Sequence, residues 1–419
     1  MALSLPSFAI FRHRQFAQFW AGRWFATLAV QVQTTAMGWQ VYDAARTHGH
    51  DVQEAAFVLG LVGLSQFLPL LVLSLFGGQA ADRYNRRLIL TACVALKAVV
   101  AGGLAAIALT GANADIVVPA VFAAAVVAGA LNAFLPPAAT ALMPMLLPRE
   151  ELPQGVAWGS LAFNSGLIVG PALGGLLYGL GAAVPYAVAL TLLLVSAALM
   201  FTLKPPPQEP APDARTLKLI AEGLRFVWSN KIVLGAISLD LIVVLLAGAV
   251  ALLPVFARDI LHAGPSELGV LRSAMGVGAA LVALGLAMNP LRSRVGHWMF
   301  GATIAFGVAT VVFGLSQHLW LTAAALAVAG GVDMISVYVR QSLIQLATPD
   351  AMRGRVAAVS FIFISASNEL GDFEAGLMAR IFGPVSAVVI GGVGAVAASL
   401  AWMRLFPALT KADGFEPHA

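Results

Sequence analysis

The chain has 419 residues, of which 60% are hydrophobic and only 11% are charged. Ordinary soluble domains carry about 25% charged residues, so this composition excludes a water-soluble globular protein and indicates a membrane protein. The single cysteine excludes a disulfide framework, and the net charge of +4 is spread along the chain, which argues against a nucleic-acid-binding patch.

Apolar runs recur along the whole chain, and each is long enough to cross a bilayer core of about 30 Å. We predict twelve transmembrane helices, near residues 16–42, 54–80, 88–110, 116–146, 154–180, 182–203, 231–257, 266–290, 296–316, 318–347, 355–382 and 384–406. The opening residues do not combine a basic start, an apolar centre and a small-residue cleavage site, so we expect no cleavable signal sequence.

Positive charges gather in alternate loops between these spans. If both termini are cytoplasmic, most of the 24 Lys and Arg residues fall in cytoplasmic segments, and the outer loops hold Arg46 and Arg258. Cytoplasmic loops of membrane proteins are enriched in Lys and Arg. We therefore predict that both termini are cytoplasmic.

Polar side chains recur at helical spacing in the first predicted span. They follow one another at steps of four, four and three residues and comprise Arg23, Thr27, Gln31 and Thr34. Such spacing places them on one helix face, which is expected to line a central cavity because charges facing lipid are costly. The residues predicted to bind an amphipathic substrate are Arg23, Gln31, Thr34, Trp24, Trp39 and Arg340.

The loop after the second span reads "GGQAADRYNRR". Gly78 would let two helices approach closely, and Asp82 could cap the next helix or form a pair across the seam between the two halves. The arginines of this loop would meet helix C-terminal carbonyls and acidic lipid headgroups. The plainer alternative is a positive loop that contains one stray acid.

The order G-x-x-x-D-R-x-x-R-R in this loop resembles the signature loop of the major facilitator superfamily. The resemblance extends over essentially the whole chain and implies an all-α membrane protein with twelve helices in two pseudo-symmetric six-helix bundles. It also implies that the loop is a conformational latch that stabilises the outward-facing state. The residues to which this role would fall are Gly78, Asp82, Arg83, Arg86 and Arg87.

The fifth span contains the string "GLIVGPALGG". Small residues every four positions let helices pack backbone to backbone, and tight packing alone would explain them. The string also resembles the G-x-x-x-G-P-x-x-G-G motif of the superfamily's drug/proton antiporters, which favours export over import. The residues of this motif are Gly166, Gly170, Pro171, Gly174 and Gly175.

A Pro-rich polar stretch, "KPPPQEPAPDARTLK", separates the two halves and is typical of a linker. We predict a first bundle over 1–203, a cytoplasmic linker over 204–230 and a second bundle over 231–419. The linker's end has the apolar spacing of an amphipathic helix on the lipid surface, or of an extension of the seventh span. Similar glycine patterns in the two halves indicate internal duplication.

Carboxylates occur inside three spans of the second half. In "SASNELGDFEAG" of the eleventh span, Glu369 and Asp372 share a helix face with Ser365 and Asn368, whereas Glu374 points elsewhere. A charge at mid-membrane costs about 2.5–3.5 kcal/mol, so this face should line an aqueous path or a partner helix. Structural ion pairing is the alternative, and we favour it for Glu374. The predicted proton carriers are Glu369, Asp372, Asp240 and Asp333.

The opening span, "RGRVAAV" and "SNELGDFEAG" resemble the enterobactin-exporter and macrolide-efflux branch of the superfamily. This resemblance implies a bacterial inner-membrane antiporter that exports a siderophore or a drug by alternating access. An importer or facilitator of the same fold and a metal-ion exporter are the alternatives, and no enzyme motif is found. We expect no cofactor, metal or nucleic acid, and a monomer whose partners are the substrate, protons and the bilayer.

Overall fold

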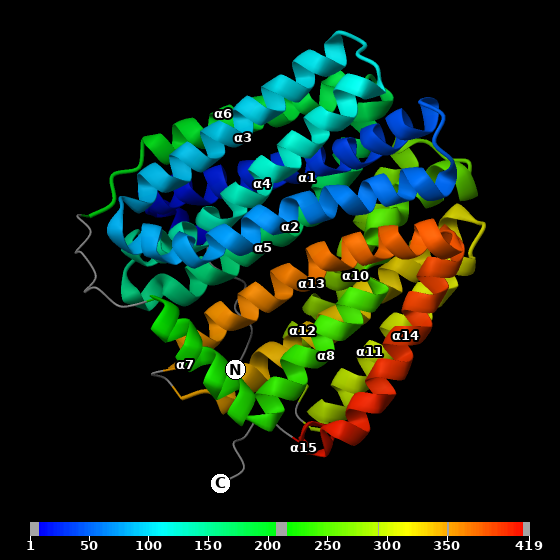
Figure 1. Cartoon of the computed structure of the whole chain (residues 1–419). Coiled ribbons are helices and arrows are strands. Elements are labelled where there is room, and N and C mark those ends of the chain that lie inside the picture. Colours follow the sequence, from blue (N-terminus) through cyan, green and yellow to red (C-terminus); the bar gives the residue numbers. More distant parts are fainter. Residues whose placement is uncertain (1–7, 207–215, 292, 350–351, 414–419) are drawn as a thin grey trace. The chain divides into compact units, whose positions relative to one another are not determined.

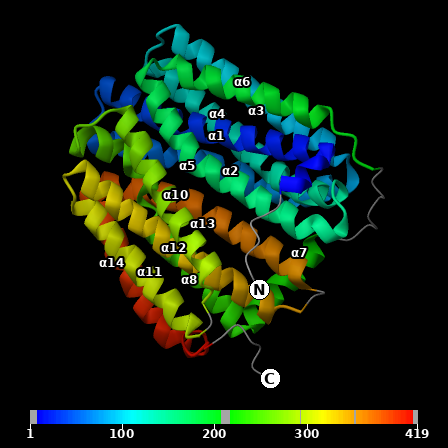
Figure 2. The same cartoon turned by 180° about the vertical axis from the view of Figure 1, so that it is seen from behind.

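The computed structural model describes residues 8–206, 216–291, 293–349 and 352–413, which form helices and contain no strand (Figure 1 and Figure 2). The helices before the linker are α1 (Arg14–Thr47), α2 (Val52–Arg83), α3 (Arg86–Leu109), α4 (Ala114–Leu142), α5 (Leu152–Gly179) and α6 (Ala183–Phe201). Those after it are α7 (Thr216–Ser229), α8 (Lys231–Ala247), α9 (Leu253–Val255), α10 (Pro265–Met288), α11 (Val295–Leu315), α12 (Leu319–Ala347), α13 (Arg353–Phe382), α14 (Pro384–Leu405) and α15 (Pro407–Thr410).

The all-α membrane fold predicted from the sequence is confirmed. Within the described residues, 10 helical segments are long and apolar enough to cross a membrane. The two other long helices, α1 and α13, are the ones that carry the predicted polar faces. Their polar residues lower their hydropathy, which indicates that these two helices are shielded from lipid along part of their surface.

The seventh span is broken, although the sequence predicts one continuous helix there. α8 ends at Ala247, and a 3-10 turn, α9 and a π-helical turn carry the chain on to Ile260. Gly248 leaves the helical region, and a Cβ at this position would lie 2.8 Å from the carbonyl oxygen of Val244. Pro254 further removes a backbone donor from this stretch, which weakens the helical hydrogen bonding there.

The structure divides into two compact units, each containing one end of α2 and of α10. Unit 1 comprises Met1–Gly49, Ser65–Asp213 and Ala263–Ser273; unit 2 comprises His50–Leu64, Ala214–His262 and Ala274–Ala419. The first turns of α2 therefore belong to unit 2, and the first turns of α10 belong to unit 1. The domain limits predicted at residues 203 and 231 divide the chain by sequence into two halves, and they stay a prediction.

The two units repeat one packing pattern. In unit 1, α1 packs against α4, α5 and α6, and α3 packs against α4 and α6 (Figure 1). In unit 2, α8 packs against α12, α13 and α14, and α11 packs against α12 and α14. Helices at matching places in the two halves thus make matching contacts. This repetition is what an internal duplication of six spans would produce.

α7 is a separate helix that packs against α13 and α8. A Cβ on Gly223 would lie 2.9 Å from the carbonyl oxygen of Arg355, and Arg355 Nη1 contacts Glu222 Oε2 at 2.5 Å. Asn230 then caps α8, because its Oδ1 accepts hydrogen bonds from the N–H groups of Ile232 and Val233. The extension of the seventh span is thus interrupted at Asn230, and the lipid-surface position of α7 stays a prediction.

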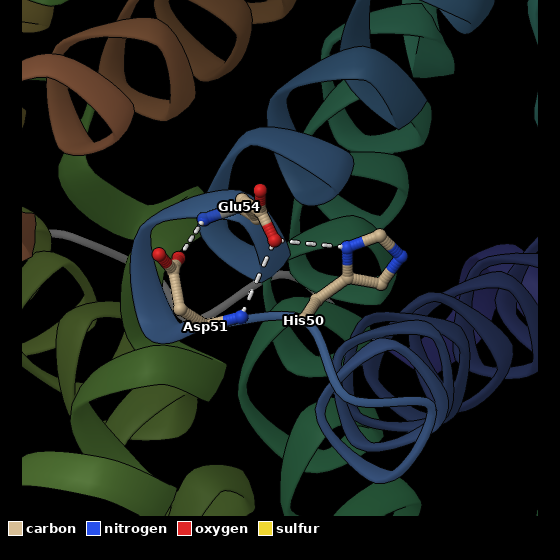
Figure 3. A network of polar contacts seen from close by, with 3 residues as sticks. All are labelled: His50, Asp51 and Glu54. Atoms are coloured by element: carbon tan, nitrogen blue, oxygen red, sulfur yellow. Dashed lines mark hydrogen bonds and ion pairs between the residues drawn. The ribbon is translucent and has the colours of Figure 1, made fainter.

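The start of α2, in unit 2, is closed by a reciprocal cap (Figure 3). Asp51 Oδ1 accepts the Glu54 N–H at 2.7 Å, and Glu54 Oε2 accepts the Asp51 N–H at 3.4 Å. The same Oε2 lies 3.2 Å from His50 Nδ1. This capping-box arrangement satisfies backbone donors at the N-terminus and holds the first turn of α2 in place.

Candidate functional site

A cavity of about 350 Å³ lies in unit 1 among α1, α4 and α5. This volume falls within the roughly 300–1,000 Å³ typical of small-molecule sites. Among the described residues that line it, Arg23 is the only charged one. The aromatic and polar side chains that line it with Arg23 are Phe16, Phe19, Trp20, Phe163, Thr27, Thr140, Ser160 and Asn164.

The packing of α1 directs Arg23 toward this cavity. The preceding residue, Gly22, faces α6, where Ser196 Oγ donates a hydrogen bond to its carbonyl oxygen at 2.7 Å. A Cβ on Gly22 would lie 2.8 Å from Met200 Cε, so the two helices meet closely there. Successive residues of a helix are rotated by about 100°, and Arg23 therefore emerges beside the α6 contact, on the side of the cavity.

Tryptophans tie α1 to α5 beside the cavity, which Trp20 lines and Trp24, although predicted to bind substrate, does not. Trp20 Nε1 donates to the carbonyl oxygen of Trp158 at 2.8 Å, and Trp24 Nε1 donates to Ser165 Oγ at 3.0 Å. The rings of Trp20 and Trp24 are stacked, with centroids 6.1 Å apart and planes 13° apart. The indole rings are thereby oriented by their hydrogen bonds. The result is a rigid aromatic surface next to a cation.

The glycines of α5 form the surface on which α1 packs. A Cβ on Gly166 would lie 2.7 Å from Thr27 Cγ2, and one on Gly170 would collide with Gln31 Cβ. A Cβ on Gly174 would likewise lie 2.8 Å from the carbonyl oxygen of Val32. The glycine motif therefore holds the polar face of α1 at close range. Its connection with antiport stays a prediction.

The other residues predicted to bind substrate do not line this cavity. Gln31 packs on α5, and Thr34 is exposed. Trp39 is only 8% exposed, so it offers little surface to a ligand in this structure. Arg340 lies in unit 2, where it is engaged in an ion pair.

The loop between α2 and α3 is held by the predicted arginine contacts. Arg86 Nη1 donates to the carbonyl oxygen of Ala141 at 3.1 Å, and Arg87 Nη1 donates to that of Leu203 at 2.8 Å. Both acceptors lie near helix C-termini, where cations are favoured. Asp82 Oδ1 lies 3.8 Å from Arg86 Nη2, and the residue that caps α3 is Asn85. The latch role of this loop stays a prediction.

Close helix approach in α2 occurs at Gly77, which corrects the expectation for Gly78. Among the described residues, no atom of another element lies within 4 Å of where a Cβ on Gly78 would be. A Cβ on Gly77 would instead collide with the carbonyl oxygen of Ala133 in α4. The two adjacent glycines point in different directions, and α4 lies on the side of Gly77.

Asp240 and Arg340 form a buried ion pair in unit 2. Arg340 Nη1 of α12 donates to Asp240 Oδ2 of α8 at 2.5 Å, with side chains 4% and 7% exposed. Asp333 lies two turns before Arg340 on the same helix and is half-buried. To carry a proton, Asp240 would thus have to break its ion pair with Arg340.

The acidic face of α13 lies against the first turns of α2 within unit 2. A Cβ on Gly63 would lie 2.9 Å from Asp372 Cβ and 3.2 Å from the carbonyl oxygen of Glu369. Both acids are half-buried, as is Glu374, whereas Asn368 is exposed. Asp372 is therefore shielded by a neighbouring helix. The assignment of the transported proton to any of these acids stays a prediction.

A family model described as transmembrane secretion effector, of the major facilitator type, matches residues 5–417. The chain belongs to this family of major facilitator superfamily transporters. Two curated relatives are enterobactin exporters. The one from Citrobacter koseri is 28% identical over 376 residues, covering 86% of this chain and 85% of its own. That from Escherichia coli O139:H28 is 28% identical over 361 residues, covering 83% and 78%.

Solved structures of other transporters share the fold of this superfamily member. A D-xylose–proton symporter matches with a TM-score of 0.71 at 15% identity, covering 96% of this chain and 99% of its own. A bacterial homologue of the iron transporter ferroportin matches with a TM-score of 0.66 at 17% identity, covering 95% and 98%. Identities this low concern the fold alone.

Sequence reasoning missed part of the transporter's cavity. Trp20 precedes Arg23 by three residues, so helical spacing could have placed it on the same face. Ser160, Phe163 and Asn164 share a similar spacing on α5, in the turns that precede the glycine motif. A buried contact from Lys97 Nζ of α3 to Asn132 Oδ1 of α4, at 2.9 Å, was also not predicted.

Proposed function

We propose that this transporter exports an amphipathic, aromatic and anionic small molecule of the siderophore type by alternating access, in exchange for protons. Its relatives are named enterobactin exporters, and this supports the direction of transport and the class of substrate. The observation that carries the proposal is Arg23, a single cation in an aromatic cavity formed by apolar membrane helices.

The cavity has the chemistry that such a substrate needs. A guanidinium group binds anionic oxygens through several N–H groups and also stacks on aromatic rings. Trp20 and Phe163 provide apolar surface, while Thr140, Ser160 and Asn164 provide hydrogen-bonding groups that can fix the orientation of a ligand. Small-molecule sites typically combine an apolar lining with a few placed polar groups.

Proton flow supplies the driving force in this proposal. Each proton that crosses a potential of 100 mV releases about 2.3 kcal/mol. Glu369 and Asp372 are the first candidates to carry it, because they are half-buried carboxylates on a polar face of α13. Asp240 and Asp333 are second, since Asp240 is already paired with Arg340.

The proposed location is the bacterial inner membrane, with both termini in the cytoplasm. The Lys and Arg residues of the predicted inner loops support this orientation. Arg86 and Arg87 are the first two residues of α3 and lie next to one such loop.

Transport by Arg23→Gln tests the proposal. In inverted vesicles with an acidic interior, the wild type should accumulate enterobactin. Loss of a charge-assisted hydrogen bond should raise the KM of Arg23→Gln about tenfold. Arg404→Gln, an exposed cation at the end of α14, is the matched control and should behave as the wild type. An unchanged KM in Arg23→Gln would remove the cavity from the proposal.

The alternatives have distinct outcomes in the same assay. Net movement of the probe only in the opposite direction would indicate an importer. No structural observation favours a metal-ion exporter. The described residues contain no group of three or more His, Cys, Asp or Glu side chains able to hold a metal.

A further inference from the structure

Two glycines of α5, Gly155 and Gly159, line the cavity in unit 1. A Cβ on Gly155 would lie 2.5 Å from Leu147 Cδ1, so close packing explains this glycine. At Gly159, by contrast, nothing among the described residues lies within 4 Å of the place that a Cβ would take, apart from its chain neighbours and the backbone of α5. Gly159 therefore leaves a notch in the wall of the cavity.

Neither packing nor backbone geometry requires a glycine at position 159. The residue lies inside α5, and its φ is not positive, so an alanine would fit the same backbone. Alanine is also the better helix former. Open space alone does not make a site, since Gly103 of α3 has it too and does not line this cavity. What distinguishes Gly159 is that the space beside it belongs to the cavity proposed to bind substrate.

An aromatic ring from each helix borders the notch. Trp20 Nε1 donates to the carbonyl oxygen of Trp158, the residue before Gly159, at 2.8 Å, which brings the indole to this level of α5. Phe163 follows Gly159 by four residues, so it lies one turn further along the same helix face. Its side chain is 48% exposed. Both rings line the cavity.

The register between α1 and α5 brings the cation of the cavity to the same level. Trp20 bonds to Trp158, and Trp24 bonds to Ser165, so residues 20–24 of α1 run beside residues 158–165 of α5. Arg23 falls within this stretch and lines the cavity. Along the helix axes, Arg23 is therefore about one turn from the notch.

We propose that the notch at Gly159 receives an aromatic ring of the transported anion, so that position 159 selects which substrates bind. This inference rests on the proposed function of the cavity and names the residue that determines its specificity. Aromatic rings attract one another in offset and edge-to-face arrangements, which Trp20 and Phe163 offer. The guanidinium group of Arg23 binds an anionic oxygen attached to that ring. An anion without a ring would use Arg23 but not the notch.

The test compares the binding of two probe anions to the purified full chain in detergent. One is 2-naphthoate, which carries aromatic rings and one carboxylate, and the other is hexanoate, which carries the same charge without a ring. Gly159→Leu fills the notch, and Gly159→Ala fills it in part. The matched control is Gly103→Leu, which adds the same side chain in open space outside the cavity.

We expect Gly159→Leu to raise the Kd of 2-naphthoate about tenfold and to leave that of hexanoate unchanged. Gly159→Ala should have a smaller effect in the same direction, and Gly103→Leu should bind both probes as the wild type does. Gly159→Ala meets only open space, so it should keep the Tm of the wild type, and it serves as the second variant if Gly159→Leu does not fold. An unchanged Kd for 2-naphthoate, or an equal loss of both probes, would overturn the notch.

Transport of enterobactin in inverted vesicles separates this inference from the proposed function. If transport depends on Arg23 and not on Gly159, the function stands and the notch is overturned. If enterobactin is not transported but 2-naphthoate binds in a manner that depends on Gly159, the notch stands and the siderophore class of substrate falls. A wild type that does not bind 2-naphthoate would overturn the notch whatever the transport assay shows.

Discussion

Arg340 of α12 and Asp240 of α8 are joined by a hydrogen bond of 2.5 Å between side chains that are almost completely buried. Removing one member of a buried pair leaves an uncompensated charge and costs about 3–5 kcal/mol, whereas replacing both by apolar residues is often neutral. We therefore expect Asp240→Asn and Arg340→Gln each to lower the Tm. The double variant Asp240→Leu with Arg340→Met should recover most of the loss.

The same set of variants separates stability from transport. If Asp240 also carries a proton, the double variant recovers its Tm but not gradient-driven transport, measured in inverted vesicles. If Asp240 is structural only, both recover together. A double variant as unstable as the single ones would contradict the pairing itself.

Gly166 and Gly170 of α5 set the distance to α1. Because a Cβ on Gly166 would lie 2.7 Å from Thr27 Cγ2, Gly166→Ala and Gly170→Ala should overpack this contact and cost about 1–3 kcal/mol. The matched control is Gly103→Ala on α3, where no described atom lies within 4 Å of the new Cβ. It should leave the Tm unchanged or raise it slightly, since alanine favours a helix. Equal losses at all three positions would contradict a specific α1–α5 contact.

The sequence predicts most of the helices well because length and hydrophobicity mark segments that can cross a membrane, although the polar helices α1 and α13 do not meet this criterion within the described residues. It also predicts the polar face of α1, since Arg23 and Thr27 share the same helical side and both line the cavity. The sequence does not predict which helix each of these residues contacts. Thr27 and Gln31 both pack on glycines of α5, yet of these two only Thr27 also lines the cavity, and only tertiary packing determines this.

The acids of unit 2 illustrate the same limit. Asp240 and Arg340 are 100 residues apart, and nothing in their local spacing indicates that two helices bring them together. The break after α8 also depends on tertiary contacts. Gly248 and Pro254 are visible in the sequence, but similar residues, such as Pro171 in α5, occur inside unbroken helices.

Gly63 of α2 allows close contact with the acidic face of α13. A Cβ there would lie 2.9 Å from Asp372 Cβ, so Gly63→Ala should push the two segments apart and make position 372 more accessible. The rate of maleimide labelling of Asp372→Cys measures this, in a background in which the buried Cys93 is replaced by serine. Gly78→Ala, on the same helix but in open space, is the control. A labelling rate unaffected by Gly63→Ala would contradict the close contact.

Asp372 is the strongest candidate for proton exchange, because it is an acid on the polar face of α13 and is shielded by α2. Asp372→Asn keeps the size of the side chain but cannot release a proton, so we expect the variant to fold with an unchanged elution profile and a similar Tm. It should lose accumulation of substrate driven by a pH gradient in inverted vesicles, while substrate exchange without a gradient persists. Glu374→Gln, which changes an acid two residues away that is predicted to be structural, should retain gradient-driven transport. Undiminished gradient-driven transport by Asp372→Asn would retire the assignment, and loss of exchange as well would indicate a defect in binding or in the conformational change.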